Sequence, residues 1–384
     1  MIVGIDASNV RIGGSVTHLV NVLANVAPER FGVSRIIVWG NRKTLTQLAD
    51  RAWLEKVHCP PLDRALPARL LWQWLRLPAL ARARCDLLFS PGGNAPGGFA
   101  PLVAMSRNML PFAWSEHSRY GISLEALRIL LLRWGQTRTF ERAQGVIFLT
   151  RYAHDAVRAI ARVRGEVAII PHGVEERFRA TPRVQRDLAE CSFERPLRLL
   201  YPSTVDVYKH QWVVAEAVAN LRADGVPVAI DFVGRAYAPA LRRLERALAR
   251  LDPAREFLRY RGLLAYEQMH SLRDASDVFV FASSCENMPN ILLEGMASGF
   301  PIACARRGPM PEILGDAGIY FEPEDAVSIE EALRALICDA ALRAKLAAAA
   351  HARARDYSWE RCARDTFAFL ERVARAARGD ATVA

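Results

Sequence analysis

The first half of the chain alternates short apolar runs with amphipathic segments. Residues 1–6 read MIVGID and lead into a loop that contains Gly13 and Gly14, after which Ser15–Ala27 shows apolar residues at helical spacing. This order is typical of a strand, a glycine turn and a helix. Further buried strands are predicted at Ser34–Trp39, Asp86–Ser90, Leu102–Met105, Gly145–Leu149 and Val167–Pro171. Because helical patterns separate several of these runs, we expect a parallel sheet with right-handed crossovers.

A second series of the same kind follows a charged, proline-containing segment, residues 171–196, which we interpret as a linker. Strands are predicted at Leu197–Tyr201, Val228–Val233, Phe257–Arg261, Asp277–Ala282, Ile302–Ala305 and Ile319–Phe321. Helices are predicted at Lys209–Ala223, Ala238–Leu251, Tyr266–Ala275, Pro289–Ser298, Ser328–Ile337, Ala340–Ala354 and Trp359–Ala377. The last residues, GDATVA, are expected to form a loose tail.

The length and the two series predict two α/β domains. At ~150 residues per domain, 384 residues suit two. We place Rossmann-like domains at residues 1–180 and 181–358, and a closing helix with its tail at residues 359–384, packing back toward the N-terminal domain. Two doubly wound domains that face each other leave an interdomain cleft at the carboxyl ends of their strands, the usual ligand site of such sheets.

One proline decides how the run Cys285–Pro301, CENMPNILLEGMASGFP, folds. Inside a helix, Pro289 would break it, whereas in the first turn the same proline starts one. Gly299 is a C-cap residue with a proline just beyond it. The sequence therefore predicts a short helix, Pro289–Ser298, that follows a buried strand.

Two glutamates flank the start of this helix, with seven residues between them. Glu286 would stand in the loop before the helix, and Glu294 one turn inside it. The free amide groups and the positive dipole end of a helix N-terminus favour an anion or several hydroxyl groups. Each carboxylate there can accept two adjacent hydroxyl groups, such as those of a sugar and a ribose. From spacing alone, the alternative is that Glu286 caps the helix and Glu294 is a surface acid.

Basic charge is concentrated in the first half of the chain. Residues 1–180 hold 24 lysines and arginines against 13 acids, whereas the remainder holds 27 against 28. This imbalance indicates an anionic partner, either acidic lipid or nucleic acid, or a solvated basic face. The segment Ala65–Arg84 is rich in leucine and arginine and holds two tryptophans, which is typical of a helix on an anionic membrane surface. Pro78 interrupts it, and helices packed on a sheet can have the same composition.

Other features narrow the setting and the chemistry. Only four of the 51 cationic residues are lysines. A chain that uses arginine almost everywhere is expected to keep lysine where a compact point charge matters, which draws attention to Lys209 after a predicted strand. The start MIVGIDAS does not resemble a signal peptide, no apolar run approaches ~20 residues, and the seven cysteines contain no CxxC pair, so we expect a cytoplasmic protein with reduced thiols. No D-x-D motif, histidine spacing or G-x-G-x-x-G motif predicts a metal ion or a cofactor.

Taken as a whole, ENMPNILLEGMASGFP resembles the E-x7-E region of the family 4 retaining glycosyltransferases, which have the two-domain GT-B fold. Gly13-Gly14 resembles the N-terminal glycine loop of that family, and Ile169–Val174 (IIPHGV) resembles its P-N-G-V turn, with His172 in place of asparagine. Gly308–Leu314 and Tyr357–Phe369 resemble a glycine-rich turn and the closing helix. The resemblance covers nearly the whole chain.

The resemblance implies a role for each matching residue. Glu286 contacts the hydroxyl groups of the donor sugar and Glu294 the ribose of the nucleotide, while Lys209 neutralises the diphosphate. Backbone groups near the sugar and the phosphates come from Asn287, Met288, Pro289 and Asn290. The N-terminal glycine loop, Gly13 and Gly14, also belongs to the donor side.

The sequence departs from the family pattern in two places. The family arginine five residues before the lysine is Thr204 here, so another cation, such as Arg235, would have to help hold the diphosphate. The family's His-Asp pair in the N-terminal domain corresponds to Arg107-Asn108. Arg107, Asn108 or His117 would then face the reacting centre on the acceptor side, unless this is an ordinary polar loop.

These observations predict a cytoplasmic, metal-independent hexosyltransferase, peripheral on the inner membrane, that uses GDP-mannose or a UDP-sugar. By resemblance to bacterial surface-polysaccharide mannosyltransferases, we favour mannose and a lipid-linked glycan or polysaccharide precursor, as in lipopolysaccharide O-antigen assembly, and we expect no nucleic-acid partner. Two alternatives stay open. One is a nucleotide-sugar epimerase of the same fold, and the other is a non-catalytic paralogue that scaffolds a glycan-assembly complex.

Overall fold

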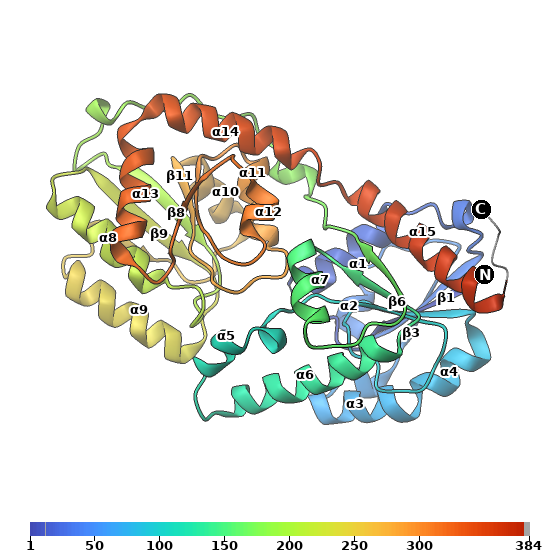
Figure 1. Cartoon of the computed structure of the whole chain (residues 1–384). Helices are drawn as coiled ribbons and strands as arrows, with labels where there is room; N and C mark the ends of the chain where they lie inside the picture. Colours follow the sequence, from blue (N-terminus) through green and yellow to red (C-terminus); the bar gives the residue numbers. More distant parts are fainter. Residues whose placement is uncertain (12, 380–384) are drawn as a thin grey trace. The chain divides into compact units, whose positions relative to one another are not determined.

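The computed structural model describes residues 1–11 and 13–379 (Figure 1). The chain divides into two compact units, one made of residues 1–173 and 357–384 and the other of residues 174–356. The closing helix α15, Trp359–Arg378, is therefore part of the first unit, where it packs on α1. Apart from Gly379, the expected loose tail lies outside the described residues.

The first unit is built on a parallel sheet with the strand order β3-β2-β1-β4-β5-β6-β7. Its strands are β1 Ile2–Ala7, β2 Arg35–Gly40, β3 Leu54–His58, β4 Leu87–Ser90, β5 Leu102–Met105, β6 Gly145–Phe148 and β7 Glu166–Ile169. Its other helices are α1 Gly14–Ala24, α2 Arg42–Leu45, α3 Leu66–Leu75, α4 Leu77–Arg84, α5 Trp114–Ser118, α6 Leu124–Arg142 and α7 Arg151–Arg158. The central strands are mostly apolar and almost entirely buried because helices cover both faces of a parallel sheet.

The second unit is a smaller parallel sheet with the order β10-β9-β8-β11-β12-β13. Its strands are β8 Leu197–Pro202, β9 Val228–Val233, β10 Leu258–Tyr260, β11 Val278–Phe281, β12 Ile302–Ala305 and β13 Ile319–Phe321. Its helices are α8 Gln211–Ala223, α9 Ala238–Leu251, α10 Tyr266–Asp274, α11 Asn290–Ala297, α12 Met310–Leu314, α13 Ala326–Cys338 and α14 Ala340–Ala354. The predicted fold class, two Rossmann-like α/β domains with parallel sheets, is confirmed.

The strand order of the second sheet defines a point where ligands bind in folds of this kind. β8 lies between β9 and β11, so the chain leaves β8 in one direction and returns on its other side. Such a switch point opens a crevice beyond the carboxyl ends of the two strands. Three aromatic rings, those of Tyr201, Phe232 and Phe281, form a buried cluster beneath it. The ring centroid of Tyr201 lies 6.1 Å from that of Phe232 and 6.1 Å from that of Phe281.

The observed elements depart most from the predicted ones at β3, at the start of α8 and in the segment Ala65–Arg84. The strand β3 was not predicted, because this edge strand is only half-buried and carries Glu55, Lys56 and His58 in place of an apolar run. The predicted helix Lys209–Ala223 begins two residues later, at Gln211. The segment Ala65–Arg84 forms two helices that meet at Arg76 and Leu77, with Pro78 in the first turn of α4.

Among the described residues, no helix is both long enough and apolar enough to cross a membrane.

Candidate functional site

The candidate site begins with a lysine and a glutamate that come from the two strands of the switch point. Lys209 follows β8 and Glu286 follows β11, and the Nζ atom of Lys209 donates a hydrogen bond to Oε1 of Glu286. The two side chains are only 7% and 15% exposed. Seventy-seven positions of sequence separate them, so only the sheet topology brings these charges together.

Lys209 is held by its surroundings rather than by a helix. The hydroxyl group of Tyr201 donates to the carbonyl oxygen of Lys209 at 2.6 Å. Its Nζ atom lies 5.0 Å from the ring centroid of Phe281 and 5.1 Å from that of Tyr208, both within cation–π range. The ammonium group is therefore fixed in position before any ligand arrives.

The local backbone explains why Lys209 precedes the helix that the sequence predicts to include it. His210 adopts a left-handed conformation with φ of 52°, which a residue in a regular helix cannot have. A hydrogen bond of 2.9 Å joins its Nε2 atom to Oγ of Ser284 in the loop after β11. This long-range contact ends the loop and lets α8 start at the next residue.

The helix α11 presents its N-terminus next to Glu286. The helix begins at Asn290, one residue later than predicted, so Pro289 is its N-cap residue. The carbonyl oxygen of Pro289 accepts the amide hydrogen of Leu292 at 3.1 Å. A proline side chain offers no oxygen atom to cap the first-turn amides. Gly299, with φ of 68°, lies just beyond the far end of the helix, as predicted. An uncapped helix start of this kind suits a phosphate group.

Glu294 lies one turn inside α11 and differs sharply from Glu286. No described group hydrogen-bonds or ion-pairs with its carboxyl group. Burial raises the pKa of Glu294 to about 7, the nearby Glu175 adds to the increase, and Arg177 and Arg273 oppose it. The structure thus holds one glutamate paired with a lysine and a second without a described partner for its side-chain oxygen atoms.

Two further predicted donor residues, Thr204 and Arg235, lie on the loops after β8 and β9. Thr204 is exposed, and its carbonyl oxygen accepts a hydrogen bond from Nε2 of Gln211 at 3.0 Å. The two loops are joined by a bond of 2.8 Å from the amide of Val205 to the carbonyl oxygen of Arg235. The guanidinium group of Arg235 is exposed and forms no ion pair with a described residue. A cation without an acidic partner therefore lies one loop away from Thr204.

In the first unit, the structure joins two of the predicted features. Gly13, with φ of 61°, precedes α1, and Nη2 of Arg107 donates to the carbonyl oxygen of Gly14 at 2.6 Å. Burial lowers the pKa of Arg107 to about 10. The side chain of Asn108 accepts the amide hydrogen of Leu110 at 3.1 Å and is exposed.

His117 does not join this group. Its Nε2 atom donates to the carbonyl oxygen of Ala126 at 2.9 Å, and its ring stacks on Trp114 with centroids 5.1 Å apart. The contacts of His117 thus connect α5 to the start of α6.

One further residue near the glycine loop, His18 of α1, was not predicted from the sequence. Its ring is fully buried, 5.0 Å from the ring of His172 and 5.9 Å from that of Trp359. Burial, with Arg107 and His172 nearby, keeps the pKa of His18 well below its ordinary value. The only signal was a histidine in a helix that follows two glycines, and it does not reveal the two distant aromatic partners.

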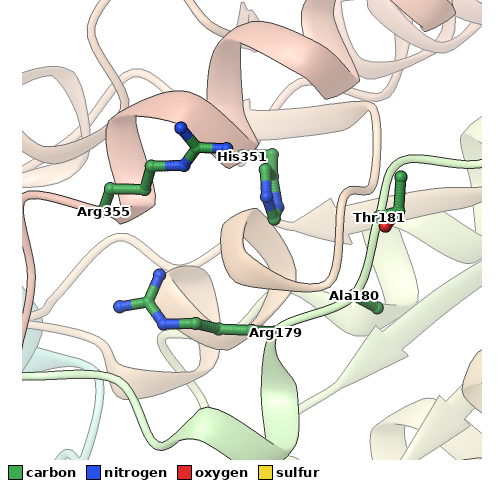
Figure 2. Close-up of a pocket in the computed structure, with 5 residues that line it drawn as sticks. All are labelled: Arg179, Ala180, Thr181, His351 and Arg355. Atoms are coloured by element: carbon green, nitrogen blue, oxygen red, sulfur yellow. The ribbon is translucent and has the colours of Figure 1, made fainter.

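A separate cavity of about 450 Å³ lies at the opposite end of α11 (Figure 2). Arg179, Ala180, Thr181, His351 and Arg355 line it. The amide of Ala180 and Nδ1 of His351 both donate to the carbonyl oxygen of Ala297, the last residue of the helix, at 3.0 and 3.1 Å. This cavity is therefore distinct from the site at Lys209 and Glu286. No group of three or more histidine, cysteine or acidic side chains within the described ranges is arranged to hold a metal ion.

The sequence matches two family descriptions, one in each unit. Residues 12–178 match "Glycosyltransferase Family 4" and residues 196–339 match "Glycosyl transferases group 1". Among curated relatives, O-antigen chain mannosyltransferase B of Escherichia coli is 32% identical over 110 residues, 29% of this chain and 29% of its own length. A sulfoquinovosyl transferase of Arabidopsis thaliana is 25% identical over 317 residues, 78% of this chain.

The chain spans 58% of the length of that second relative, so neither relative is matched over two thirds of its length. Among solved structures, HepE of Anabaena in complex with UDP-glucose superposes with a TM-score of 0.66 at 18% identity, covering 99% of this chain and 100% of that one. The similarity to HepE shows the fold.

Proposed function

Because the chain belongs to the glycosyltransferases of group 1 and family 4, we propose that it transfers a hexose from a nucleotide-sugar to a lipid-linked glycan or polysaccharide precursor, retaining the anomeric configuration without a metal ion. The observation that carries the proposal is the meeting of Lys209 and Glu286 at the switch point, beside the N-terminus of α11. Lys209 supplies a fixed cation for the diphosphate, and the N-terminus of α11 supplies a contact for a phosphate oxygen. The carboxyl group of Glu294 supplies a contact for the ribose.

Lys209 is the residue best placed to assist bond breaking. As the bond between the sugar and the diphosphate breaks, negative charge grows on the leaving phosphate, and a pre-positioned cation in a buried site stabilises that charge without having to reorganise. In the free protein Glu286 balances this cation. The diphosphate replaces Glu286 as the partner of Lys209, and the released carboxylate then accepts hydroxyl groups of the sugar.

The proposed reaction is a displacement on one face of the sugar. The bond from the anomeric carbon to the phosphate oxygen breaks, and the acceptor oxygen bonds to the same face through an oxocarbenium-like state. The leaving phosphate takes the proton of the acceptor hydroxyl group, so no separate carboxylate nucleophile is needed. The acceptor is held by the N-terminal unit, where Arg107 adjoins the glycine loop.

We favour GDP-mannose as the donor and keep UDP-sugars as the second choice. The mannosyltransferase of E. coli, whose name includes the O-antigen chain, supports mannose and a surface-polysaccharide precursor. The UDP-glucose bound to HepE supports a UDP-sugar. The base, the sugar and the acceptor all belong to the proposal.

A panel of nucleotide-sugars tests the donor. We expect GDP-mannose or one UDP-sugar to raise the melting temperature of the purified full chain and to yield free nucleoside diphosphate when a lipid-linked acceptor is added. Glu286→Gln should abolish transfer, whereas Glu216→Gln, which removes one partner of an exposed ion pair with Arg250, should leave it unchanged. Conversion of the nucleotide-sugar into its epimer, without release of nucleotide, would refute the transferase. If no nucleotide-sugar shifts the melting temperature and Glu286→Gln has no effect in the cell, the result would favour a non-catalytic scaffold protein.

A further inference from the structure

Exposed apolar side chains are concentrated in one part of the first unit. Fifteen large hydrophobic side chains of the described residues are exposed, and ten of them lie between residues 71 and 134, on or beside α3, α5 and α6. The other five are scattered along the chain. A concentration of this kind on a folded domain marks an interaction surface, whereas single exposed residues do not.

The helix α6 is apolar on two different faces. Ala126, Ile129 and Phe140 point into the unit and are buried. A second set, Leu124, Leu127, Leu131 and Trp134, repeats every three or four residues and is between 54% and 87% exposed. We call this second set the outer stripe of α6. Its spacing places all four side chains on one face of the helix, away from the core.

The helix α3 adds three more exposed residues next to this stripe. Leu71, Trp74 and Leu75 are each more than half exposed. The loop at Asn94 contacts both helices, because Nε2 of Gln73 in α3 donates to its carbonyl oxygen at 3.0 Å and Gly135 of α6 packs on its side chain. The two helices thus lie near each other in the first unit (Figure 1).

Arginine residues lie beside some of these apolar side chains. Residues 64–142 contain eleven arginines, no lysine and four acids. The guanidinium group of Arg138 lies 5.8 Å from the ring centroid of Trp134, and that of Arg133 lies 5.9 Å from that of Trp114. Arg69 of α3 lies close enough to Arg128 of α6 for their charges to interact. Positive charge with few balancing acids therefore borders the exposed leucines and tryptophans.

We propose that the outer stripe of α6, together with Leu71, Trp74 and Leu75 of α3, docks onto an anionic lipid bilayer. The leucines enter the acyl boundary, the indole rings lie at the headgroup level, and the arginines bind lipid phosphates. A second copy of the chain fits less well, since a two-fold contact through this face would bring its arginines against the same arginines of the partner. The inference rests on the proposed function only in assuming that the acceptor is held in a membrane.

Vesicle binding without any nucleotide-sugar tests the surface. The full chain should sediment with phosphatidylcholine vesicles that contain roughly one third phosphatidylglycerol, and less with phosphatidylcholine alone or at high salt. Leu127→Glu with Leu131→Glu should lower the partition coefficient at least tenfold. The matched double variant Val184→Glu with Val327→Glu changes two exposed aliphatic residues of the other unit and should bind as the wild type does.

The melting shift with a nucleotide-sugar, measured without lipid, serves as the control for folding and separates this inference from the proposed function. Both double variants should keep that shift if the donor site is intact. Equal vesicle binding by the two double variants, or no binding by the wild type, would overturn the docking surface even if the transferase is correct. A concentration-dependent dimer that only the α6 double variant abolishes would also overturn it, because that result assigns the face to a second copy of the chain.

Discussion

Replacing Glu294 with glutamine should make the free protein more stable near neutral pH while it weakens donor binding. The pKa of about 7 lies roughly 2.5 above the ordinary value of 4.5, and one pKa unit corresponds to about 1.36 kcal/mol. The upper limit of the destabilisation is therefore about 3 kcal/mol. Because the side chain is not fully buried, we expect about 1–3 kcal/mol.

The sign follows from comparing the folded and unfolded chains. Below pH 4.5 the carboxyl group of Glu294 is protonated in both, and the Glu294→Gln variant should match the wild type. As the pH rises from 4.5 to about 7, the unfolded chain ionises first, so the wild type loses stability relative to the variant. Above pH 7 the gap is constant.

Thermal unfolding at several pH values measures this gap. At about 2–4 °C per kcal/mol for a unit of this size, the Glu294→Gln variant should melt about 2–12 °C above the wild type at pH 8, with the difference vanishing near pH 4.5. Glu216→Gln, at a half-exposed surface position, serves as the control and should show no such pH dependence. A variant that melts at or below the wild-type temperature at pH 8 would refute the assigned environment of Glu294.

Donor binding should respond in the opposite direction. A carboxylate accepts hydrogen bonds from both ribose hydroxyl groups, whereas an amide has only one oxygen, and a charge-assisted hydrogen bond contributes about 1.5–3 kcal/mol. Nucleoside diphosphate should therefore bind Glu294→Gln at least tenfold more weakly, as measured by calorimetry. For the wild type, affinity should rise with pH up to about 7 and then level off. An affinity that is independent of both pH and this substitution would show that Glu294 does not contact the ligand.

Three further substitutions have defined outcomes. Lys209→Met should abolish transfer and lower stability by about 3 kcal/mol, because it leaves Glu286 unpaired. Adding Glu286→Gln to this variant should restore most of the stability, measured as melting temperature, but should not restore activity. Arg343→Met should lower stability by about 3 kcal/mol or more in urea unfolding, because this buried side chain donates to the carbonyl oxygens of residues 336 and 337 at 2.6 Å. Gly173→Ala should lower the melting temperature, since a Cβ atom there overlaps the backbone of Trp359; an unchanged melting temperature would contradict that packing.

Local signals were enough to predict α11 closely. A proline and a glycine mark its two ends, and each acts through its own backbone geometry rather than through distant partners. The helix start was therefore predicted to within one residue, and Glu286 was correctly placed in the loop before it. The buried strands were equally clear, because strands covered on both faces form uninterrupted apolar runs.

Two features, the start of α8 and the exposed apolar face of α6, depend on tertiary contacts and could not be predicted from the sequence. The start of α8 depends on the left-handed His210, which is joined to Ser284 across 74 positions of sequence. The outer stripe of α6 was missed for another reason: the helix is apolar on two faces, so its periodicity does not show that one face is exposed. The segment Ala65–Arg84, whose composition favours a membrane contact, is only partly exposed: Leu71, Trp74 and Leu75 belong to the proposed surface, whereas Trp72, Leu77 and Pro78 are buried.

The two glutamates also show why a motif does not by itself assign electrostatic roles. In the sequence, Glu286 and Glu294 are the two acids of one E-x7-E spacing, and nothing distinguishes their electrostatic roles. In the structure, Glu286 balances the charge of Lys209, while Glu294 has no described partner and burial raises its pKa to about 7. In the proposed complex, the diphosphate takes the place of Glu286 beside Lys209, and the ribose donates hydrogen bonds to the partly buried carboxylate of Glu294. The ion pair between Lys209 and Glu286 therefore competes with the donor, whereas Glu294 favours it, and only Glu294 makes donor affinity depend on pH near neutrality.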